Sequence, residues 1–228
     1  MLMSNKVQNK YFTDEEARET LYGKYKPNAK RVQKSYTYKN GAVYIGEFKG
    51  GFRDGKGIMK WPDGAKYDGD WQDGQAFGQG RFYHADGDIY DGVWCNNKAN
   101  GFGSYINVKG AKYEGYWLDD QQHGKGLETW QEGSKYEGDY EFGKKQGNGK
   151  YIWADGSVYE GEWLDNKICG KGIYLWRDGR RYYGSWENND MEGFGVYFWG
   201  DGRKFEGQYH QDKKWGYGIY IWPNGRKY

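Results

Sequence analysis

Residues 67–89 read YDGDWQDGQAFGQGRFYHADGDI, and the first five letters of this stretch decide the fold. Tyr67, Gly69 and Trp71 lie two positions apart, so on a β-strand they share one face of the sheet. Asp68 and Asp70, which lie between them, then share the other face. The stretch therefore predicts a strand with one aromatic face and one charged face.

The same motif returns every 23 residues without an insertion. Its copies are Tyr44-x-Gly46-x-Phe48, Tyr67-x-Gly69-x-Trp71, Tyr90-x-Gly92-x-Trp94, Tyr113-x-Gly115-x-Trp117, Tyr136-x-Gly138-x-Tyr140, Tyr159-x-Gly161-x-Trp163, Tyr182-x-Gly184-x-Trp186 and Phe205-x-Gly207-x-Tyr209. A turn glycine and a Gly-x-Gly pair keep the same period, and Tyr228 opens a ninth copy. A fixed period of this length is the signature of a repeat architecture. Because Gly149, Tyr151 and Trp153 alternate in the same way, we expect two strands per repeat.

Two kinds of joint connect these strands. One kind favours two-residue type I′ turns, whose positive φ values suit Asp, Asn and Gly. Its dipeptides are Asn40-Gly41, Asp63-Gly64, Asp86-Gly87, Asp155-Gly156, Asp178-Gly179, Asp201-Gly202 and Asn224-Gly225. We expect these tight turns to join neighbouring repeats. The longer polar stretch 50–55 and its equivalents are expected to join the two strands within one repeat.

These motifs resemble the MORN (membrane occupation and recognition nexus) repeat, whose pattern is close to Tyr-x-Gly-x-Trp followed by Gly-x-Gly at this length. The resemblance covers about residues 38–228 and implies an all-β fold, an elongated, twisted single-layer antiparallel sheet of stacked 23-residue β-hairpins. We expect residues 38–228 to hold eight repeats and the start of a ninth. Residues 1–37 are expected to form an N-terminal arm.

Within this arm, Thr13-Asp14-Glu15-Glu16 predicts a capping box, in which the Thr13 hydroxyl accepts from the Glu16 N–H and the Glu16 carboxylate reaches back. A short helix over about 14–22, with Gly23 after its end, is the expected result. A basic lead-in follows, with Lys24, Lys26, Lys30, Arg31, Lys34 and Lys39 and no acid between them. Either it is a solvated arm, or it docks on an acidic protein surface, an anionic membrane or phosphate groups.

Composition excludes several classes of protein. The chain holds 24 Tyr, 12 Trp, 10 Phe and 39 Gly among 228 residues, and disordered segments are poor in aromatics. The net charge of +2 gives no general attraction to nucleic acid or anionic lipid. With only Cys95 and Cys169, no disulfide framework is predicted. No apolar run approaches the ~18 residues of a membrane span, and we expect a cytoplasmic protein.

The excess of glycines and the excess of aromatic residues have one structural explanation. We expect each Tyr or Trp ring to cover a glycine of the adjacent strand, which shields backbone that water would otherwise reach. Cross-strand aromatic pairs add roughly 0.2–1 kcal/mol each, so the array is stable only as a whole. Most of the aromatic residues are therefore structural.

The charged face forms columns of its own, and we interpret them as a solvated face rather than an acidic docking strip. Its members include Lys66, Asp68, Asp91, Lys112, Glu114, Lys135, Glu137, Glu160, Arg181, Lys204 and Glu206.

A single-layer sheet cannot bury both faces, so part of the aromatic face should remain open as a groove for a partner. The column of Trp61 is interrupted by His84 and Asn107, but from Trp130 onward it is unbroken. We therefore place the partner in the C-terminal half; the alternative is that the early repeats tolerate drift. The predicted contact residues are Tyr136, Tyr151, Trp153, Tyr159, Trp163, Tyr174, Trp176, Tyr182, Trp186, Tyr197, Trp199 and Trp222.

No catalytic or metal site is predicted, and no cofactor. His84, His123 and His210 lie in different repeats without a matching nucleophile or a Cys at metal-ligand spacing. The stretch Gly50-x-x-x-x-Gly55-Lys56 lacks the Ser or Thr that would follow in a phosphate-binding loop. We expect a protein that is not an enzyme.

The resemblance implies a scaffold that binds protein partners, similar to subunits of ciliary and flagellar axonemes such as radial-spoke-head proteins. The expected setting is a large cytoskeletal complex, with self-association through the open C-terminal edge as a further expectation. The alternative is a peripheral membrane or phospholipid-binding module, or a regulatory repeat region of a larger protein, and the balanced charge argues against it.

Overall fold

The structure is a computed structural model that describes residues 10–20 and 28–228. The chain divides into two compact units, Met1–Gln122 and His123–Tyr228. The first unit contains the helix α1 (Asp14–Glu19) and the strands β1 (Val32–Thr37), β2 (Val43–Lys49), β3 (Phe52–Lys60), β4 (Lys66–Gln72), β5 (Gln75–Tyr83), β6 (Ile89–Cys95), β7 (Lys98–Ile106) and β8 (Lys112–Leu118). Most of β9 (Gln121–Thr129) lies in the second unit, with β10 (Lys135–Glu141), β11 (Lys144–Ile152), β12 (Val158–Leu164), β13 (Lys167–Leu175), β14 (Arg181–Glu187), β15 (Asp190–Phe198), β16 (Lys204–His210) and β17 (Lys213–Ile221).

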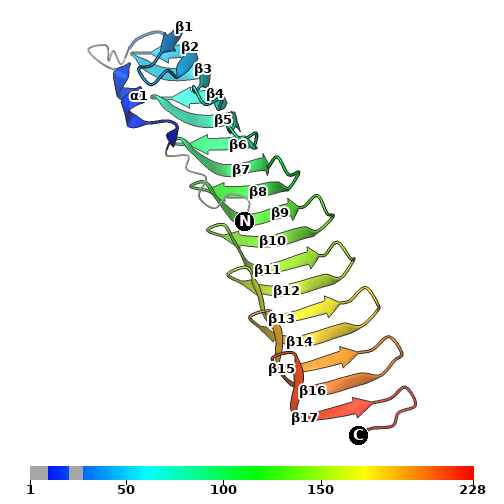
Figure 1. Ribbon diagram of the computed structural model, residues 1–228. Helices are drawn as coiled ribbons and strands as arrows, with labels where there is room; N and C mark the ends of the chain where they lie inside the picture. The colour runs from blue at the N-terminus through cyan, green and yellow to red at the C-terminus, as the bar shows by residue number, and fades with distance from the viewer. Residues whose placement is uncertain (1–9, 21–27) are drawn as a thin grey trace. The chain divides into compact units, whose positions relative to one another are not determined.

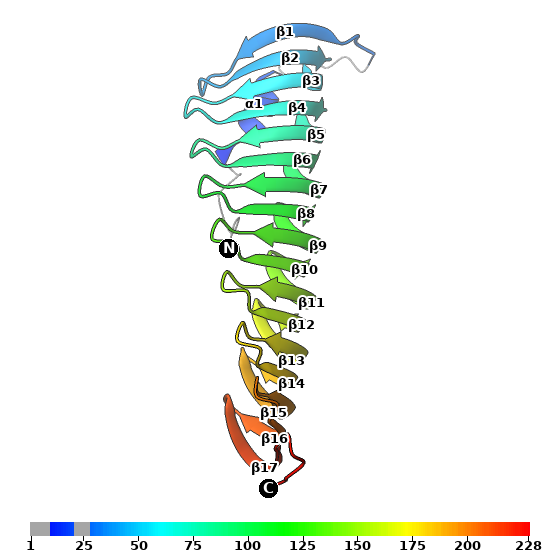
Figure 2. The ribbon, with the colours of Figure 1, turned by 90° about the vertical axis from the view of Figure 1, so that its right-hand side faces the viewer.

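Within each unit, every strand pairs antiparallel with the next strand in the sequence (Figures 1 and 2). Two strands, the turn that joins them and the loop to the next hairpin make one 23-residue repeat, and the hairpins stack in a single layer. The predicted all-β class and the stacked antiparallel hairpins are confirmed.

The register places glycines opposite glycines and rings opposite rings. Gly46 pairs with Gly57, and Gly57 pairs with Gly69 on the following strand. The Tyr44 ring covers both Gly46 and Gly57, because a Cβ built on either glycine would overlap its atoms. The Tyr44 hydroxyl donates to the Glu47 carbonyl at 3.0 Å. The expected shielding of glycine backbone by aromatic rings is therefore confirmed, and it recurs at Tyr67, Tyr90, Tyr136, Tyr159, Tyr182 and Phe205.

The core of each unit lies on this aromatic face. The tyrosines of the Tyr44 column are 0% exposed. Beside them, the Trp71 indole donates to the Gly57 carbonyl at 3.1 Å and meets the Tyr44 ring edge-on at 5.3 Å. On the opposite face, Lys112 pairs with Glu114 at 2.7 Å, which supports a solvated face where opposite charges offset each other.

The predicted assignment of the two turn types is wrong, because the two joints are exchanged. The two-residue turns lie inside the repeats, for example at Asn96 (φ 51°) and Asn97 (φ 66°), where both residues have the positive φ that a type I′ turn requires. Asp63-Gly64 instead lies in the longer loop 61–65, closed by hydrogen bonds from Gly64 N–H to Trp61 O and from Trp61 N–H to Ala65 O, both 3.0 Å.

The physical reason is that Asp-Gly suits both kinds of turn. In the longer loop the Asp63 carboxylate accepts from the Ala65 N–H at 3.1 Å, and Gly64 supplies the left-handed residue (φ 94°) that ends the turn. Asn-Asn and Asp-Asn pairs satisfy the type I′ turns without glycine, since both residues tolerate positive φ.

The helix α1 begins after Thr13, whose hydroxyl accepts from the Glu16 N–H at 3.3 Å. The helix ends at Glu19 with Thr20 as its C-cap, so the expected extension to residue 22 with Gly23 after its end is wrong; Gly23 itself lies outside the described residues. The reciprocal half of the capping box is replaced, because the Glu16 carboxylate points into the sheet. Residues 32–37 of the basic lead-in form the strand β1, which pairs with β2.

Candidate partner-binding surface

The chain covers the aromatic face of its first unit with its own N-terminal segment, residues 10–20 (Figure 1). Phe12 lies among the rings of Trp61 and Trp94, at centroid distances of 5.1 and 5.7 Å. Tyr11 lies 4.9 Å from Trp61 and 5.2 Å from Phe82. This segment leaves Trp61 7% exposed and Phe82 0% exposed.

Polar contacts fix the start of the segment. The Tyr11 hydroxyl donates to the Asp63 carboxylate at 2.8 Å, and the Lys10 ammonium lies 2.6 Å from the same carboxylate. Burial acts to raise the pKa of Asp63, but the hydrogen bonds from Lys10 and Tyr11 outweigh it, and the pKa is lowered.

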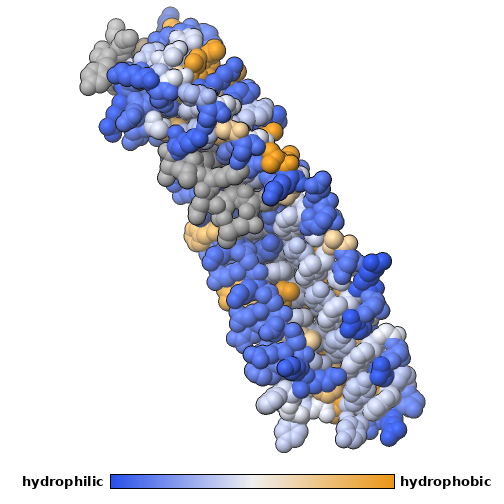
Figure 3. Space-filling model, in the orientation of Figure 1, coloured by the Kyte–Doolittle hydropathy of each residue, from blue (hydrophilic) through white to orange (hydrophobic). Residues whose placement is uncertain are grey.

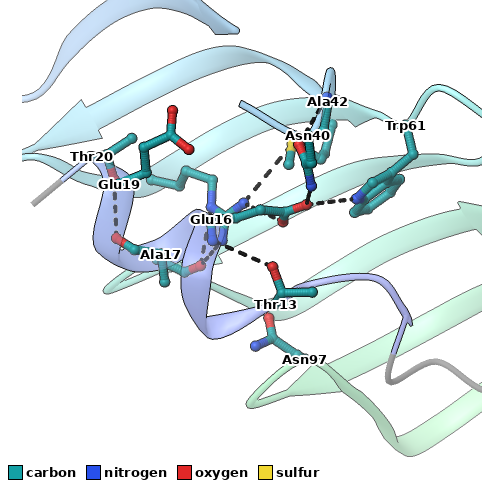
Figure 4. A network of polar contacts seen from close by, with 12 residues as sticks. Thr13, Glu16, Ala17, Glu19, Thr20, Asn40, Ala42, Trp61 and Asn97 are labelled. Atoms are coloured by element: carbon teal, nitrogen blue, oxygen red, sulfur yellow. Dashed lines mark hydrogen bonds and ion pairs between the residues drawn. The ribbon is translucent and has the colours of Figure 1, made fainter. Parts of the chain in front are cut away.

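The Glu16 carboxylate extends from the helix toward Asn40 and Trp61 (Figure 4). It accepts from the Asn40 amide at 2.7 Å and the Trp61 indole at 3.1 Å, and the Arg53 guanidinium lies at 3.5 Å. Arg53 is 1% exposed and lies over the Trp71 ring at 4.4 Å. Breaking such a buried ion pair by removing one partner costs about 3–5 kcal/mol.

In the second unit, the equivalent columns are open. We call these residues the aromatic strip; all are half-buried, and they are Trp130, Tyr151, Trp153, Tyr174, Trp176, Trp199, Tyr220 and Trp222. Their rings follow one another at close distances, for example 5.0 Å from Trp153 to Tyr174 and 5.2 Å from Trp199 to Tyr220. Figure 3 shows a band of pale side chains, of intermediate hydropathy, over this unit between hydrophilic margins.

The structure divides the predicted contact residues into two groups. Tyr151, Trp153, Tyr174, Trp176, Trp199 and Trp222 lie on the strip and offer surface. Beneath them lie residues that are at most 9% exposed and form the floor: Tyr136, Tyr159, Trp163, Tyr182, Trp186 and Tyr197. The predicted set lacked Trp130 and Tyr220. Their columns would have identified both, since each continues a column that the prediction already used.

Sequence reasoning also missed the cations beside the strip. The position of Arg53 recurs as Lys145 and Lys214. The Lys145 ammonium lies 3.4 Å from the buried Glu128 carboxylate and 5.1 Å from the Trp130 ring centroid. The Lys214 ammonium lies 4.6 Å from the Trp199 centroid, and burial lowers its pKa. The period of 23 residues was the signal that could have found them.

The basic lead-in is divided differently. Lys24 and Lys26 lie outside the described residues, and Lys30, Lys34 and Lys39 are exposed. The Arg31 guanidinium hydrogen-bonds to the Asp54 carboxylate at 2.6 Å, which raises the pKa of Arg31. Lys34 lies over the Phe48 ring at 4.7 Å. At least part of the positive charge is therefore engaged by the sheet.

Across residues 10–20 and 28–228, no group of three or more His, Cys, Asp or Glu side chains is placed to hold a metal ion. In the same part of the chain, no helix is long and apolar enough to cross a membrane.

A single layer of identical hairpins with rings covering glycines defines a β-hairpin repeat protein. The family model of the MORN repeat matches residues 44–66, 67–89, 90–112, 113–135, 136–158, 159–180, 182–202 and 205–225. The chain belongs to the MORN repeat family. No curated protein matches the sequence, so no named relative supports the resemblance to radial-spoke-head proteins.

Solved structures with some similarity include centriole-protein domains. The TCP10 domain of Danio rerio CPAP is 12% identical, over 85% of this chain and 91% of that chain, with a TM-score of 0.47. The SAS-4 (dCPAP) TCP domain of Drosophila melanogaster, in complex with a proline-rich motif of Ana2 (dSTIL), is 15% identical, over 89% of this chain and 92% of that chain, with a TM-score of 0.38.

Proposed function

We propose that this protein is a non-enzymatic scaffold that holds protein partners along the aromatic strip of its second unit. One observation carries the proposal. A peptide segment, the chain's own residues 10–20, covers the aromatic columns of the first unit, and the same columns are half-exposed in the second.

The strip has the physical properties of a binding surface. Each Tyr or Trp can bury roughly 150–250 Å², so contact with several rings supplies ample apolar area. The rings are already held by their neighbours, as in the 4.5 Å contact between Tyr174 and Trp176, so a partner orders little on binding. Tyrosine and tryptophan are also the residues that most often dominate interface energies.

A paired substitution tests this role. Trp176→Ala with Trp199→Ala removes two half-exposed rings of the strip. Ile173→Ala with Tyr183→Ala is the matched control, because both residues are 38% exposed and lie opposite each other in the charged-face register. We expect the first pair to lower retention of native partners at least tenfold and the control pair to retain them. Equal retention by both folded variants would refute the strip as the binding surface.

For the cellular setting, we propose a cytoplasmic cytoskeletal assembly, with the ciliary axoneme and its radial spokes as the specific site. Membership of the MORN repeat family, in which such scaffolds are expected, is the basis of this proposal, and the balanced charge disfavours the phospholipid-binding alternative. Co-purification with salt-washed axonemes is the expected result. Flotation with anionic liposomes, without association with axonemes, would contradict it.

A further inference from the structure

The site that holds Tyr11 and Phe12 in the first unit is repeated 92 residues later. Trp61, Asp63, Tyr67, Trp71 and Trp94 line it in the first unit. Their equivalents are the identical residues Trp153, Asp155, Tyr159, Trp163 and Trp186. Phe82 becomes Tyr174, and Arg53 becomes Lys145. All the equivalent residues belong to the second unit.

The two sites have the same ring geometry. The distance from Trp61 to Phe82 is 5.6 Å and from Trp153 to Tyr174 it is 5.0 Å. From Phe82 to Trp94 and from Tyr174 to Trp186 it is 6.0 Å in both. The second site therefore has the arrangement of an occupied site although none of the described residues stands where Tyr11 and Phe12 stand in the first.

Exposure marks the difference. Trp61 and Phe82 are buried under the N-terminal segment, whereas Trp153 and Tyr174 are half-buried. Asp155 is exposed, and one of its carboxylate oxygens accepts from the Ser157 N–H at 2.8 Å, as Asp63 accepts from the Ala65 N–H. Its other oxygen accepts from the Ser157 hydroxyl at 3.1 Å, a contact that Asp63 lacks. A carboxylate oxygen can accept more than one hydrogen bond, so Asp155 can still accept the hydroxyl and the ammonium that Asp63 accepts in the first unit.

We propose that the site around Trp153, Asp155 and Tyr174 binds a segment of a partner protein with the chemistry of residues 10–20: a basic residue, two consecutive aromatic residues and a capped helical turn. This deepens the proposed function and rests on it. The segment inserts its second aromatic ring between Trp153 and Trp186, and its first aromatic residue donates to Asp155 if it is a tyrosine.

The charged residues around the second site also predict the charge of one residue in the partner segment, the one equivalent to Glu16. In the first unit Glu16 meets Asn40 and Arg53, but their equivalents are Glu132 and a Lys145 that already pairs with the buried Glu128 at 3.4 Å. An acid at the position of Glu16 would face two carboxylates and a cation that is already paired. We therefore expect the partner segment to carry a neutral or basic residue at that position, because an acidic residue there would be repelled by the carboxylates.

The test uses the full chain and two fluorescent peptides of residues 10–20, one native and one with Glu16→Gln. The chain's own segment stays bound to the first unit, because its effective concentration is on the order of millimolar. We expect the Glu16→Gln peptide to bind about fivefold more tightly than the native peptide, as removal of a like charge allows. We expect Trp153→Ala in the chain to weaken binding at least tenfold and Asp155→Asn to weaken it about threefold.

Trp222→Ala is the control, since it removes a half-exposed ring of the strip outside this site. It should leave peptide affinity unchanged. Equal binding of the Glu16→Gln peptide to the wild type and Trp153→Ala, or no binding at all, would overturn the assignment. A chain that is dimeric and becomes monomeric with peptide would overturn it in favour of a second copy as the occupant.

Failure here is distinguishable from failure of the proposed function. If the peptides do not bind but Trp176→Ala with Trp199→Ala still releases native partners, the strip remains the scaffold surface and only the segment chemistry is wrong. If native partners are retained by that variant as well, the proposed function fails.

Discussion

Residues at the same position of different repeats can make the same hydrogen bond with different effects on stability. Asp120 occupies the second position of a two-residue turn, where Asn97, Asn166 and Asn189 stand in other repeats. Its carboxylate accepts from the Ala99 N–H at 2.7 Å, as Asn97 accepts from the Ala76 N–H at 2.7 Å. Burial raises the pKa of Asp120 to about 6. At neutral pH its carboxylate is charged although partly buried, and this desolvation lowers the stability of the folded state, whereas a neutral asparagine would not.

We therefore predict that Asp120→Asn stabilises the protein at pH 7.5 by about 1–2 kcal/mol, a value discounted for partial solvent screening. The folded pKa lies above the ordinary value, so the stability of the wild type falls as pH rises through about 6. The advantage of the variant should shrink below pH 6 and disappear near pH 4. Urea unfolding across this range measures it. A constant advantage at all pH values would refute the assigned cause.

Glu16 shows how tertiary structure can override a local signal. Its carboxylate was predicted to close a capping box but instead pairs with Arg53 under the sheet's rings. We predict that Glu16→Ala lowers the free energy of unfolding by about 1–3 kcal/mol, less than the full cost of a buried broken pair because the segment can lift and expose Arg53 to water. Glu15→Ala, at an exposed position of the same helix, should change it by less than about 0.5 kcal/mol. Urea unfolding of both variants checks this, and equal effects would show that Glu16 acts only as a helix residue.

At the scale of the hairpin, much could be predicted from the sequence because rings and glycines alternate with a period of two. The strands, their faces and the ring over glycine all follow from that alternation. The turns could not be assigned, because Asp63-Gly64 and Asn96-Asn97 both satisfy positive φ and only the hydrogen-bond register decides which closes the tight turn.

Glycines that lie under a ring and glycines that lie in a turn should differ in how well they tolerate a side chain, which gives a prediction for one hairpin. Gly57→Ala would place a methyl group inside the Tyr44 ring, whereas Gly64 has open space around its Cβ position and only its φ of 94° opposes a side chain. We expect Gly57→Ala to lower the free energy of unfolding by about 2–4 kcal/mol. Gly64→Ala should cost about 1 kcal/mol. Chemical denaturation of the two variants compares them directly, and a larger loss for Gly64→Ala would contradict the ring-over-glycine packing.

At the scale of the whole chain, the 23-residue period predicts the aromatic columns but not the segment that covers them in the first unit. The aromatic columns run through both units, and nothing periodic indicates that Tyr11 and Phe12 cover the first unit's columns. The C-terminal choice of surface came from the unbroken column of tryptophans and stays a prediction. The structure adds a different argument for it, because Trp61 and Phe82 are buried in the first unit whereas Trp153 and Tyr174 are half-exposed in the second. The docked segment had no sequence signal beyond its helix cap.

Removing that cover should create a second binding site. Tyr11→Ala with Phe12→Ala deletes the two rings that lie within 5.2 Å of Phe82 or Trp61. The segment then keeps polar contacts such as the Lys10–Asp63 and Glu16–Arg53 pairs but loses these aromatic contacts. We predict that the peptide of residues 10–20 then binds at two sites per chain instead of one, measured by calorimetric titration. The new site should prefer the native peptide over its Glu16→Gln form. In the first unit Arg53 pairs with the Glu16 carboxylate, whereas in the second unit the equivalent Lys145 is already paired with Glu128. A stoichiometry that stays at one, with the variant still folded, would mean that the aromatic columns alone do not make a docking site.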